Sequence, residues 1–570
     1  MVRQRLIRKA AVALAACLIS LGAASLCQAE TNEQAVDAQT EEQPAIQAKA
    51  AITSCTIGSD KNTITITAES SGDMTGTDGK FYLFELKPYE DEVGDRRDFL
   101  ASGTGENLKW TASLDYGQES DKLYSKFIIA VHNGTDFVEI SEPYFITNPE
   151  AVAGNTAPFT SPGTKKGLNI ELSMLDDAFD LGVKHVGTNI AFHQILGSGI
   201  DYTYDGKTYH FNKELIAQYD NIISALSGKG MTVTAIILNG WNSATPDLIY
   251  PGTKQSSNAF YYLFNVTTPK GFEQTRAIMA FLAERYDGSN PDHGKISNWI
   301  LGNEINNQQW NYTGEWDIDS YVKAYQKAFR VFYTAIKSTS ANDRVYFSLD
   351  YNWNNPKEWD GKLKYGGKEI VDTFNSVANQ WGQIDWGLAY HPYPCPMTEP
   401  EFWDDEKTGL FTNDFQSPVI NFKNLNLLTQ YFEQDSLKAP SGEVRNIILT
   451  EQGFTGVDGT RGDVQQIQAA AFAYSYYLVD SNPHIDAYIL SRQVDAPSER
   501  KDGLGFGLWE CDMNQPNKIV PTRRRKIWEV FRDIDKKKNT LEATEFAKEI
   551  IGIQNWKDVV PNFRWRSLEK

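Results

Sequence analysis

The sequence predicts an α/β protein, a (β/α)8 TIM barrel preceded by a small N-terminal β-sandwich domain. Three observations support this prediction. The chain has 570 residues, which at about 150 residues per domain leaves room for two to four domains. Its contents of 41% hydrophobic and 23% charged residues are typical of globular proteins. Near residue 166 the hydrophobic pattern changes from short alternating runs to apolar runs separated by amphipathic segments.

Residues 1–29 have the pattern of a secretory signal peptide. Basic residues between positions 3 and 9 precede an apolar run over 10–26, and small residues follow at Cys27 and Ala29. We therefore expect cleavage after Ala29 and a secreted protein, free in the medium or attached to the cell surface. A membrane anchor is the alternative, although the run is barely long enough to cross about 30 Å of hydrocarbon. Residues 14–17 also resemble a lipoprotein cleavage box.

The next two segments differ in composition. Residues 30–52 are rich in Ala, Gln and Glu without an apolar period, so we expect a disordered linker. Residues 53–150 contain short runs that alternate between apolar and polar side chains, separated by Gly and Asp turns, which predicts the β-sandwich domain. The runs are 63–67, 81–86, 110–114, 127–131 and 137–140.

Residues 155–570 are predicted to form the barrel domain with a C-terminal helical tail. Eight short, mostly apolar runs lack strict alternation, as strands covered on both faces require. They are 167–171, 185–189, 232–238, 297–301, 344–349, 384–390, 446–450 and 485–490. The amphipathic segments between them are 214–226, 271–286, 318–337, 368–379, 424–433 and 464–478. An open doubly wound sheet is the alternative, but the first strand is not followed by a glycine-rich fingerprint.

Charge and cysteine content narrow the class of partner. A formal charge of -19 would repel a phosphate backbone, so we expect no nucleic-acid partner. We expect no membrane contact beyond the signal peptide, and a monomer. Cys55, Cys395 and Cys511 allow at most one disulfide. A metal is not expected, because no zinc-ligand spacing occurs. A cofactor is not expected either, because acid/base chemistry and a carboxylate nucleophile suffice for the reaction considered below. The 12% aromatic content on an acidic chain hints at a carbohydrate substrate.

The candidate catalytic residues are two glutamates at strand ends. In a parallel barrel, the carboxyl ends of the strands meet at one mouth. Glu304 follows the fourth predicted strand and Glu451 follows the seventh, and these strands face each other across the barrel. Glycoside hydrolysis needs such a pair, with one carboxyl group to protonate the departing oxygen and one to attack the anomeric carbon.

Three further residues fit this chemistry. Tyr393, after the sixth strand, could donate a hydrogen bond that keeps Glu451 ionised, while a less polar surrounding would raise the pKa of Glu304. Asn303 suits a donor to the sugar hydroxyl next to the reacting carbon. His391 could orient the site or bind a hydroxyl group.

These motifs resemble those of the retaining glycoside hydrolases of clan A. An Asn-Glu pair ends strand four, a Glu ends strand seven, and His-x-Tyr follows strand six. The resemblance covers about residues 166–535 and implies that Glu304 is the general acid/base and Glu451 the nucleophile of a double displacement. One departure concerns strand eight, where clan members often carry a tryptophan. This chain instead has Ser491 and Arg492, so either a loop aromatic such as Trp509 replaces that floor or the first subsite is unusual. Arg492 could instead face an acidic sugar.

Other residues of the predicted loops could bind sugar. Asn239 and Trp241 follow strand three, and Trp310 follows strand four. Flat aromatic rings at a cleft mouth stack on the apolar faces of pyranoses, although each tryptophan could equally anchor its loop. The basic run 523–526 is expected to be solvent-exposed.

The sequence therefore predicts a secreted retaining glycoside hydrolase that cleaves a poly- or oligosaccharide. The main alternative is a non-catalytic carbohydrate-binding surface protein with a hydrolase-like barrel, which the departure at strand eight favours. A polysaccharide lyase is a third option, but it would need a Lys, Tyr or His base that the motifs do not supply.

Overall fold

A computed structural model describes residues 48–71 and 76–563. The predicted signal peptide and most of the predicted linker lie outside these residues. In the described part of the chain, no helix is both long enough and apolar enough to cross a membrane. The three described cysteines, Cys55, Cys395 and Cys511, are free thiols.

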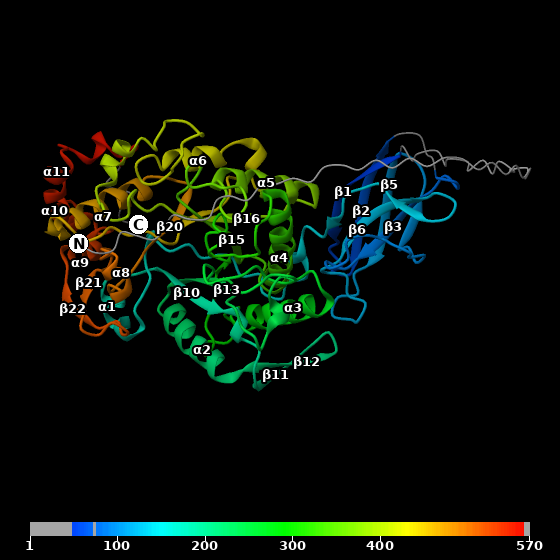
Figure 1. The fold of residues 1–570 in the computed structure, drawn as a ribbon. Coiled ribbons are helices and arrows are strands. Elements are labelled where there is room, and N and C mark those ends of the chain that lie inside the picture. The colour runs from blue at the N-terminus through cyan, green and yellow to red at the C-terminus, as the bar shows by residue number, and fades with distance from the viewer. Residues whose placement is uncertain (1–47, 72–75, 564–570) are drawn as a thin grey trace, which may run out of the picture. The chain divides into compact units, whose positions relative to one another are not determined.

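Eight parallel strands close into a barrel, which confirms the predicted fold of this region (Figure 1). Each strand pairs with its neighbours in chain order, and the eighth pairs with the first. The strands are β9 (Lys166–Leu168), β10 (His185–Ala191), β13 (Thr232–Leu238), β14 (Asn298–Leu301), β15 (Arg344–Asp350), β16 (Trp386–His391), β17 (Ile447–Leu449) and β20 (Ile485–Leu490).

The barrel interior is a packed core. Ile300, Tyr346, Ala389, Ile448 and Ala487 from five strands are buried in one cluster. This filling is typical of eight-stranded parallel barrels, in which side chains leave no open channel. It also explains why the strand sequences are almost continuously apolar, since their outer faces are covered by helices.

Helices follow the strands and cover the outside of the barrel (Figure 1). Side chains cap several of them, as in α4, where Asp317 accepts a hydrogen bond from the backbone N–H of Ser320. The helices are α1 (Leu175–Asp180), α2 (Lys213–Gly228), α3 (Pro269–Arg285), α4 (Ile318–Thr339), α5 (Gly367–Gln380), α6 (Asn426–Phe432), α7 (Gln465–Asp480), α8 (Pro497–Lys501), α9 (Lys526–Asp533), α10 (Lys537–Ala543) and α11 (Glu545–Ile551).

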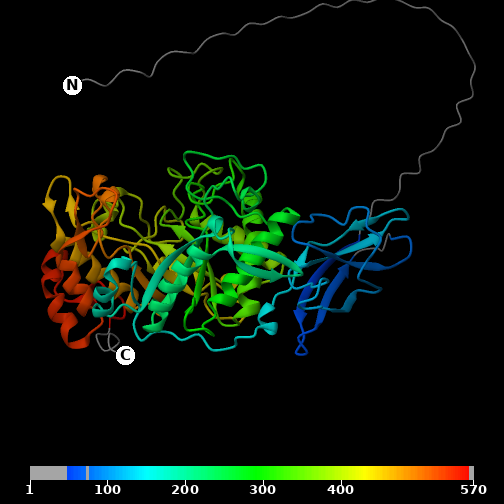
Figure 2. The ribbon, with the colours of Figure 1, turned by 90° about the horizontal axis from the view of Figure 1, so that it is seen from below.

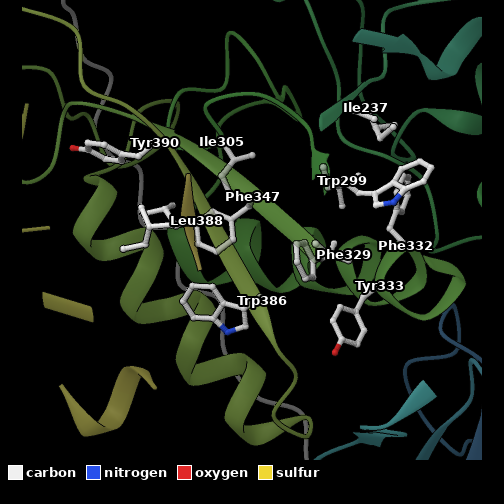
Figure 3. Close-up of a cluster of buried hydrophobic side chains, with 14 of the residues drawn as sticks. Ile237, Trp299, Ile305, Phe329, Phe332, Tyr333, Phe347, Trp386, Leu388 and Tyr390 are labelled. Carbon is white, nitrogen blue, oxygen red and sulfur yellow. The ribbon is translucent and has the colours of Figure 1, made fainter. Parts of the chain in front are cut away.

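Aromatic side chains join the barrel strands to their covering helices. Figure 3 shows Phe347 of β15 and Trp386 of β16 in one cluster with Phe329 and Tyr333 of α4. The ring centroids of Phe347 and Trp386 are 5.3 Å apart. Such contacts fix each strand against its helix and thereby fix where each strand ends.

The N-terminal region forms two antiparallel sheets. One has the order β1-β2-β5 and the other the order β4-β3-β6-β7, with β8 also paired to β6. Strand β1 begins at Lys49, whereas we expected disorder as far as residue 52. The strands are β1 (Lys49–Ile57), β2 (Thr63–Ser71), β3 (Phe81–Leu86), β4 (Ala101–Gly103), β5 (Asn107–Ser113), β6 (Lys126–His132), β7 (Phe137–Glu139) and β8 (Tyr144–Phe145).

The loops of the barrel contain three small antiparallel hairpins. They consist of β11 (Gly199–Tyr204) with β12 (Lys207–Asn212), β18 (Val457–Asp458) with β19 (Gly462–Asp463), and β21 (Trp509–Cys511) with β22 (Pro521–Arg524).

The N-terminal sheets contact helices α4 and α5. The backbone N–H of Phe145 donates to the carbonyl of Trp381 at 2.9 Å. The guanidinium of Arg330 lies 5.0 Å from the Phe145 ring centroid and donates to the carbonyl of Ala378 at 3.1 Å. Because Arg330 is buried, these carbonyl and aromatic contacts replace water around its charge.

The tail helices α9, α10 and α11 gather beside α7 (Figure 2). Phe531 of α9 stacks on Phe472 of α7 with ring centroids 5.3 Å apart. We expected the basic run 523–526 to be solvent-exposed, but one of its residues is buried. Arg525 is only 1% exposed and binds the fully buried carboxylate of Asp495 at 2.8 and 2.5 Å. This ion pair joins the start of the tail to the loop that follows β20.

Candidate active site

Glu304 lies immediately after β14 in a tightly held turn. Its φ of 38° is in the left-handed region, which a non-glycine residue adopts at an energetic cost. The neighbouring strand supplies the restraint, because the backbone N–H of Glu304 donates to Oγ of Ser348 at 2.8 Å. The N–H of Ile305 donates to the Ser348 carbonyl at 3.0 Å. The backbone that carries Glu304 is thus fixed to β15.

The side chain of Glu304 is largely withdrawn from water. It is 13% exposed, and its Oε1 lies 2.8 Å from Nδ1 of His391. Burial raises the pKa of Glu304 to about 7, although the hydrogen bond and charge of His391 act to lower it. Burial acts to lower the pKa of His391, but the hydrogen bond and charge of Glu304 outweigh it and raise that pKa. The pair therefore retains a proton near neutral pH.

His391 itself is held from its other side. Its Nε2 lies 3.0 Å from Oγ1 of Thr450, the residue that precedes Glu451. The imidazole is 2% exposed, so its orientation is set by these two contacts rather than by solvent. His391 thus connects the ends of β14 and β17.

Glu451 is the more open of the two glutamates. Its side chain is 42% exposed, against 13% for Glu304. The hydroxyl of Tyr393 donates to Oε1 of Glu451 at 2.9 Å. Tyr393 is buried, and its ring packs against Phe506 with centroids 5.5 Å apart. A buried donor thus holds one oxygen of Glu451, Oε1.

The two carboxyl groups lie close together. Nδ1 of His391 is 2.8 Å from Oε1 of Glu304 and 4.0 Å from Oε2 of Glu451. The two oxygens are therefore separated by at most the sum of these distances, about 6.8 Å, which lies below most of the range of inverting pairs. A separation of about 5 Å, typical of retaining pairs, is within this bound.

Both glutamates line one cavity of about 510 Å³ at the carboxyl ends of the barrel strands. This volume suits a small-molecule or sugar site. The cavity wall also has polar side chains that could bind hydroxyl groups, namely Asn169, Thr188, Asn189, Ser348, Thr450 and Gln493. The described residues contain no group of three or more His, Cys, Asp or Glu side chains arranged to hold a metal ion.

Other predicted binding residues fall into two groups. Asn303, Trp310, His391 and Arg492 line the cavity with the glutamates, and Tyr393 lies just behind Glu451. Asn239, Trp241 and Trp509 do not belong to its wall.

These three have other contacts. The amide of Asn239 donates to the carbonyl of Leu248 at 2.9 Å, which closes its own loop. The Trp241 ring packs against Tyr262 with centroids 5.3 Å apart. The indole of Trp509 donates to Asp177 at 3.0 Å, and Arg524 lies over its ring. The role of Trp509 as a replacement for the sugar floor stays a prediction, which these contacts do not favour.

Arg492 has an acidic partner inside the cavity. Its guanidinium forms an ion pair with Glu499 of α8, and both residues belong to the cavity wall. The charge that could have attracted an acidic sugar is thus largely neutralised. With Glu171, Glu304 and Glu451 also present, carboxyl groups outnumber the single guanidinium of the wall.

The sequence analysis missed several residues of the wall. Asn169 and Glu171 follow β9, and reading the end of the first strand as we read the fourth and seventh would have found them. Tyr261 lies in the long segment between β13 and α3, and Glu499 lies on a short helix after β20. Neither carries a local pattern that distinguishes it from a loop residue.

Some solved structures share part of this fold, all at low similarity. A family 39 glycoside hydrolase from Bacteroides cellulosilyticus WH2 is 14% identical, with a TM-score of 0.43 over 81% of this chain and 78% of the other. A glucosidase from Croceicoccus marinus is 12% identical, with a TM-score of 0.39 over 66% and 68%. A family 1 β-glucosidase from Thermotoga maritima is 15% identical, with a TM-score of 0.37 over 65% and 85%.

No curated protein matches the sequence. A family model does match, and it covers residues 158–559, the whole barrel and most of its tail. Because this match spans well over half of the chain, the protein belongs to the family of unknown function DUF5722.

Proposed function

We propose that the protein is a retaining glycoside hydrolase in which Glu304 is the general acid/base and Glu451 the nucleophile. The observation that carries this proposal is the contrast between two nearby carboxyl groups on one cavity. Burial raises the pKa of Glu304 to about 7, which suits a proton donor at neutral pH. Glu451 is exposed to the cavity and accepts a hydrogen bond from Tyr393 at 2.9 Å, which suits an ionised nucleophile.

The reaction would proceed in two steps. In the first, Glu304 gives its proton to the glycosidic oxygen while the Glu451 carboxylate attacks the anomeric carbon, so the C–O bond breaks and a glycosyl ester forms. In the second, Glu304 takes a proton from water, which attacks the anomeric carbon and releases Glu451. Each step inverts the anomeric centre, so the product keeps the configuration of the substrate.

The roles can be separated by azide rescue. In Glu451→Ala, azide enters the space of the nucleophile, and the expected product is a glycosyl azide with inverted configuration. In Glu304→Ala, azide attacks the glycosyl ester instead, and the expected azide retains the configuration of the substrate. The substrates are 2,4-dinitrophenyl glycosides of several neutral sugars, and the products are assigned by NMR. Identical product configurations in both variants would contradict the assignment of roles.

A non-catalytic carbohydrate-binding protein is the competing proposal, and the ion pair at the end of β20 favours it. Arg492 and Glu499 occupy part of the wall where clan A enzymes often present an aromatic floor. Wild-type protein that binds glycans but hydrolyses no member of a broad panel of aryl glycosides and polysaccharides would support this alternative. Turnover that is lost in Glu451→Gln would exclude it.

We also propose that the protein is secreted and that its N-terminal sheets form a domain that packs on the barrel. The pattern of residues 1–29 supports secretion of the protein. The two N-terminal sheets contact each other through β1 with β6 and through β5 with β4, which supports a β-sandwich domain. The contacts of Phe145 with Trp381 support a packing role for that domain. We propose a monomer with a carbohydrate substrate and no nucleic-acid partner.

A further inference from the structure

An aromatic ladder extends from the candidate active site toward solvent. Tyr261 and Trp310 both line the cavity. Their ring centroids are 6.3 Å apart, and Phe260 stacks on Trp310 at 4.8 Å with an interplanar angle of 17°. Phe260 is 57% exposed, more than any other large hydrophobic side chain in the described part of the chain. We call Tyr261, Trp310 and Phe260 the aromatic ladder.

The inner end of the ladder is close to the nucleophile. Burial raises the pKa of Tyr261, and the negative charge of Glu451 raises it further. Tyr261 and Glu451 also line the same cavity, so the inner ring of the ladder and the proposed nucleophile border one space. Trp310 comes next, and the exposed ring of Phe260 is the outermost member.

Backbone hydrogen bonds between two loops make the ladder rigid. The N–H of Phe260 donates to the carbonyl of Gln309 at 2.8 Å, and the N–H of Tyr312 donates to the carbonyl of Tyr261 at 2.9 Å. The N–H of Tyr262 donates to the carbonyl of Asn239 at 2.8 Å. The exposed ring of Phe260 is therefore carried by a backbone segment that is hydrogen-bonded to a second loop.

We propose that the aromatic ladder is a distal subsite that stacks a neutral pyranose unit of the same glycan chain whose bond is cleaved between Glu304 and Glu451. This inference rests on the proposed hydrolase function and deepens it. The CH-rich face of a pyranose covers an exposed ring that water hydrates poorly. A neutral sugar is favoured because the cavity wall carries four glutamates against Arg492, which is already paired with Glu499. The preferred substrate is thus an oligosaccharide or polysaccharide rather than a single glycoside.

The test compares substrates of different length. The probes are 4-nitrophenyl monoglycosides and neutral gluco-, xylo-, manno- and galacto-oligosaccharides of increasing length, with uronate-containing oligosaccharides as a charged series. We expect Phe260→Ala to lower kcat/KM for the longer neutral oligosaccharides by about threefold to tenfold, the factor that one aromatic stack supplies. Its kcat/KM for the monoglycosides should not change. Phe260→Trp, which keeps an aromatic ring at this position, should retain the wild-type preference for long substrates.

Phe99→Ala is the matched control. Phe99 is also an exposed phenylalanine, at 43%, but it packs against Tyr82 in the N-terminal sheets. The Phe99→Ala substitution should leave kcat/KM unchanged for every substrate. Equal kcat/KM of Phe260→Ala and wild type at all lengths would overturn the inference, as would a preference for the uronate series. An equal loss on monoglycosides and long substrates would also overturn it, because that result indicates damage to the reacting centre.

A binding experiment separates failure of the inference from failure of the proposed function. Glu451→Gln and the double variant Glu451→Gln/Phe260→Ala are titrated with the same oligosaccharides, and tryptophan fluorescence is followed. Weaker binding of long oligosaccharides by the double variant supports the ladder even where the wild type shows no turnover. Unchanged binding, or binding of a protein partner that Phe260→Ala abolishes while glycans have no effect, overturns it.

Discussion

The ends of β14 and β17 carry the same residue type in different surroundings. At the end of β14, Glu304 has a left-handed backbone held by Ser348 and a side chain that is 13% exposed. At the end of β17, Glu451 is 42% exposed and its carboxylate is held by the hydroxyl of Tyr393. In the proposed mechanism, burial and hydrogen bonding rather than residue type assign proton donation to one glutamate and nucleophilic attack to the other.

The largest expected effect concerns the leaving group. Glu451→Ala should lower kcat by at least about 10⁴-fold on every substrate. A better leaving group cannot compensate for this loss, because the attacking carboxylate itself is missing. Glu304→Ala should lose about 10²–10⁴-fold on substrates with poor leaving groups. It should retain much of the first-step rate on 2,4-dinitrophenyl glycosides, which need no proton. Pre-steady-state release of dinitrophenol measures this step. Similar losses for both variants on that substrate would remove the distinction between the two strand ends.

A smaller effect is expected for the support of Glu451. Tyr393→Phe removes the hydroxyl that donates to Oε1 at 2.9 Å but keeps the ring against Phe506. A hydrogen bond to a charged group contributes about 1.5–3 kcal/mol, so kcat should fall about tenfold to a hundredfold. Thermal unfolding controls for loss of packing. An unchanged kcat would mean that Glu451 is oriented without Tyr393.

The smallest effect is a pH dependence of about tenfold per unit. Glu304 can donate only when protonated, and its pKa is raised to about 7 by burial. The value of kcat/KM should therefore fall as the pH rises through about 7. In Glu304→Gln with a dinitrophenyl glycoside, the fall at high pH should disappear. If it persists there, another group, such as His391, sets that limb.

The strands could be predicted because their requirement is local. A strand covered on both faces must be almost continuously apolar, and the eight runs that meet this condition are the eight strands of the barrel. The two glutamates followed from the same reasoning, since parallel strands bring their carboxyl ends to one mouth. Their exposure and the bridging position of His391 could not be predicted, because they depend on contacts between distant strands.

The course of the loops could not be predicted from local patterns. The tryptophans of the predicted loops have similar local patterns, but Trp310 lines the cavity whereas Trp241 packs against Tyr262. Glu499 reaches the wall from a short helix after β20, and no local pattern indicated that it would pair with Arg492. The run 523–526 was predicted to be solvent-exposed, yet Arg525 is buried, because it forms an ion pair with the buried carboxylate of Asp495.

The ion pair between Asp495 and Arg525 connects the C-terminal tail to the loop that contributes to the cavity wall. A shortened protein that stops between α8 and α9 would lose Arg525 and leave the buried Asp495 carboxylate with the more distant Arg500, at 3.4 Å. Loss of one partner of a buried ion pair costs up to about 3–5 kcal/mol. The segment from the end of β20 through α8 carries Arg492 and Glu499 to the cavity wall, and it would lose its contact with Arg525. Expression fragments, fusions and circular permutants of this family should therefore keep the first tail helix attached to the barrel.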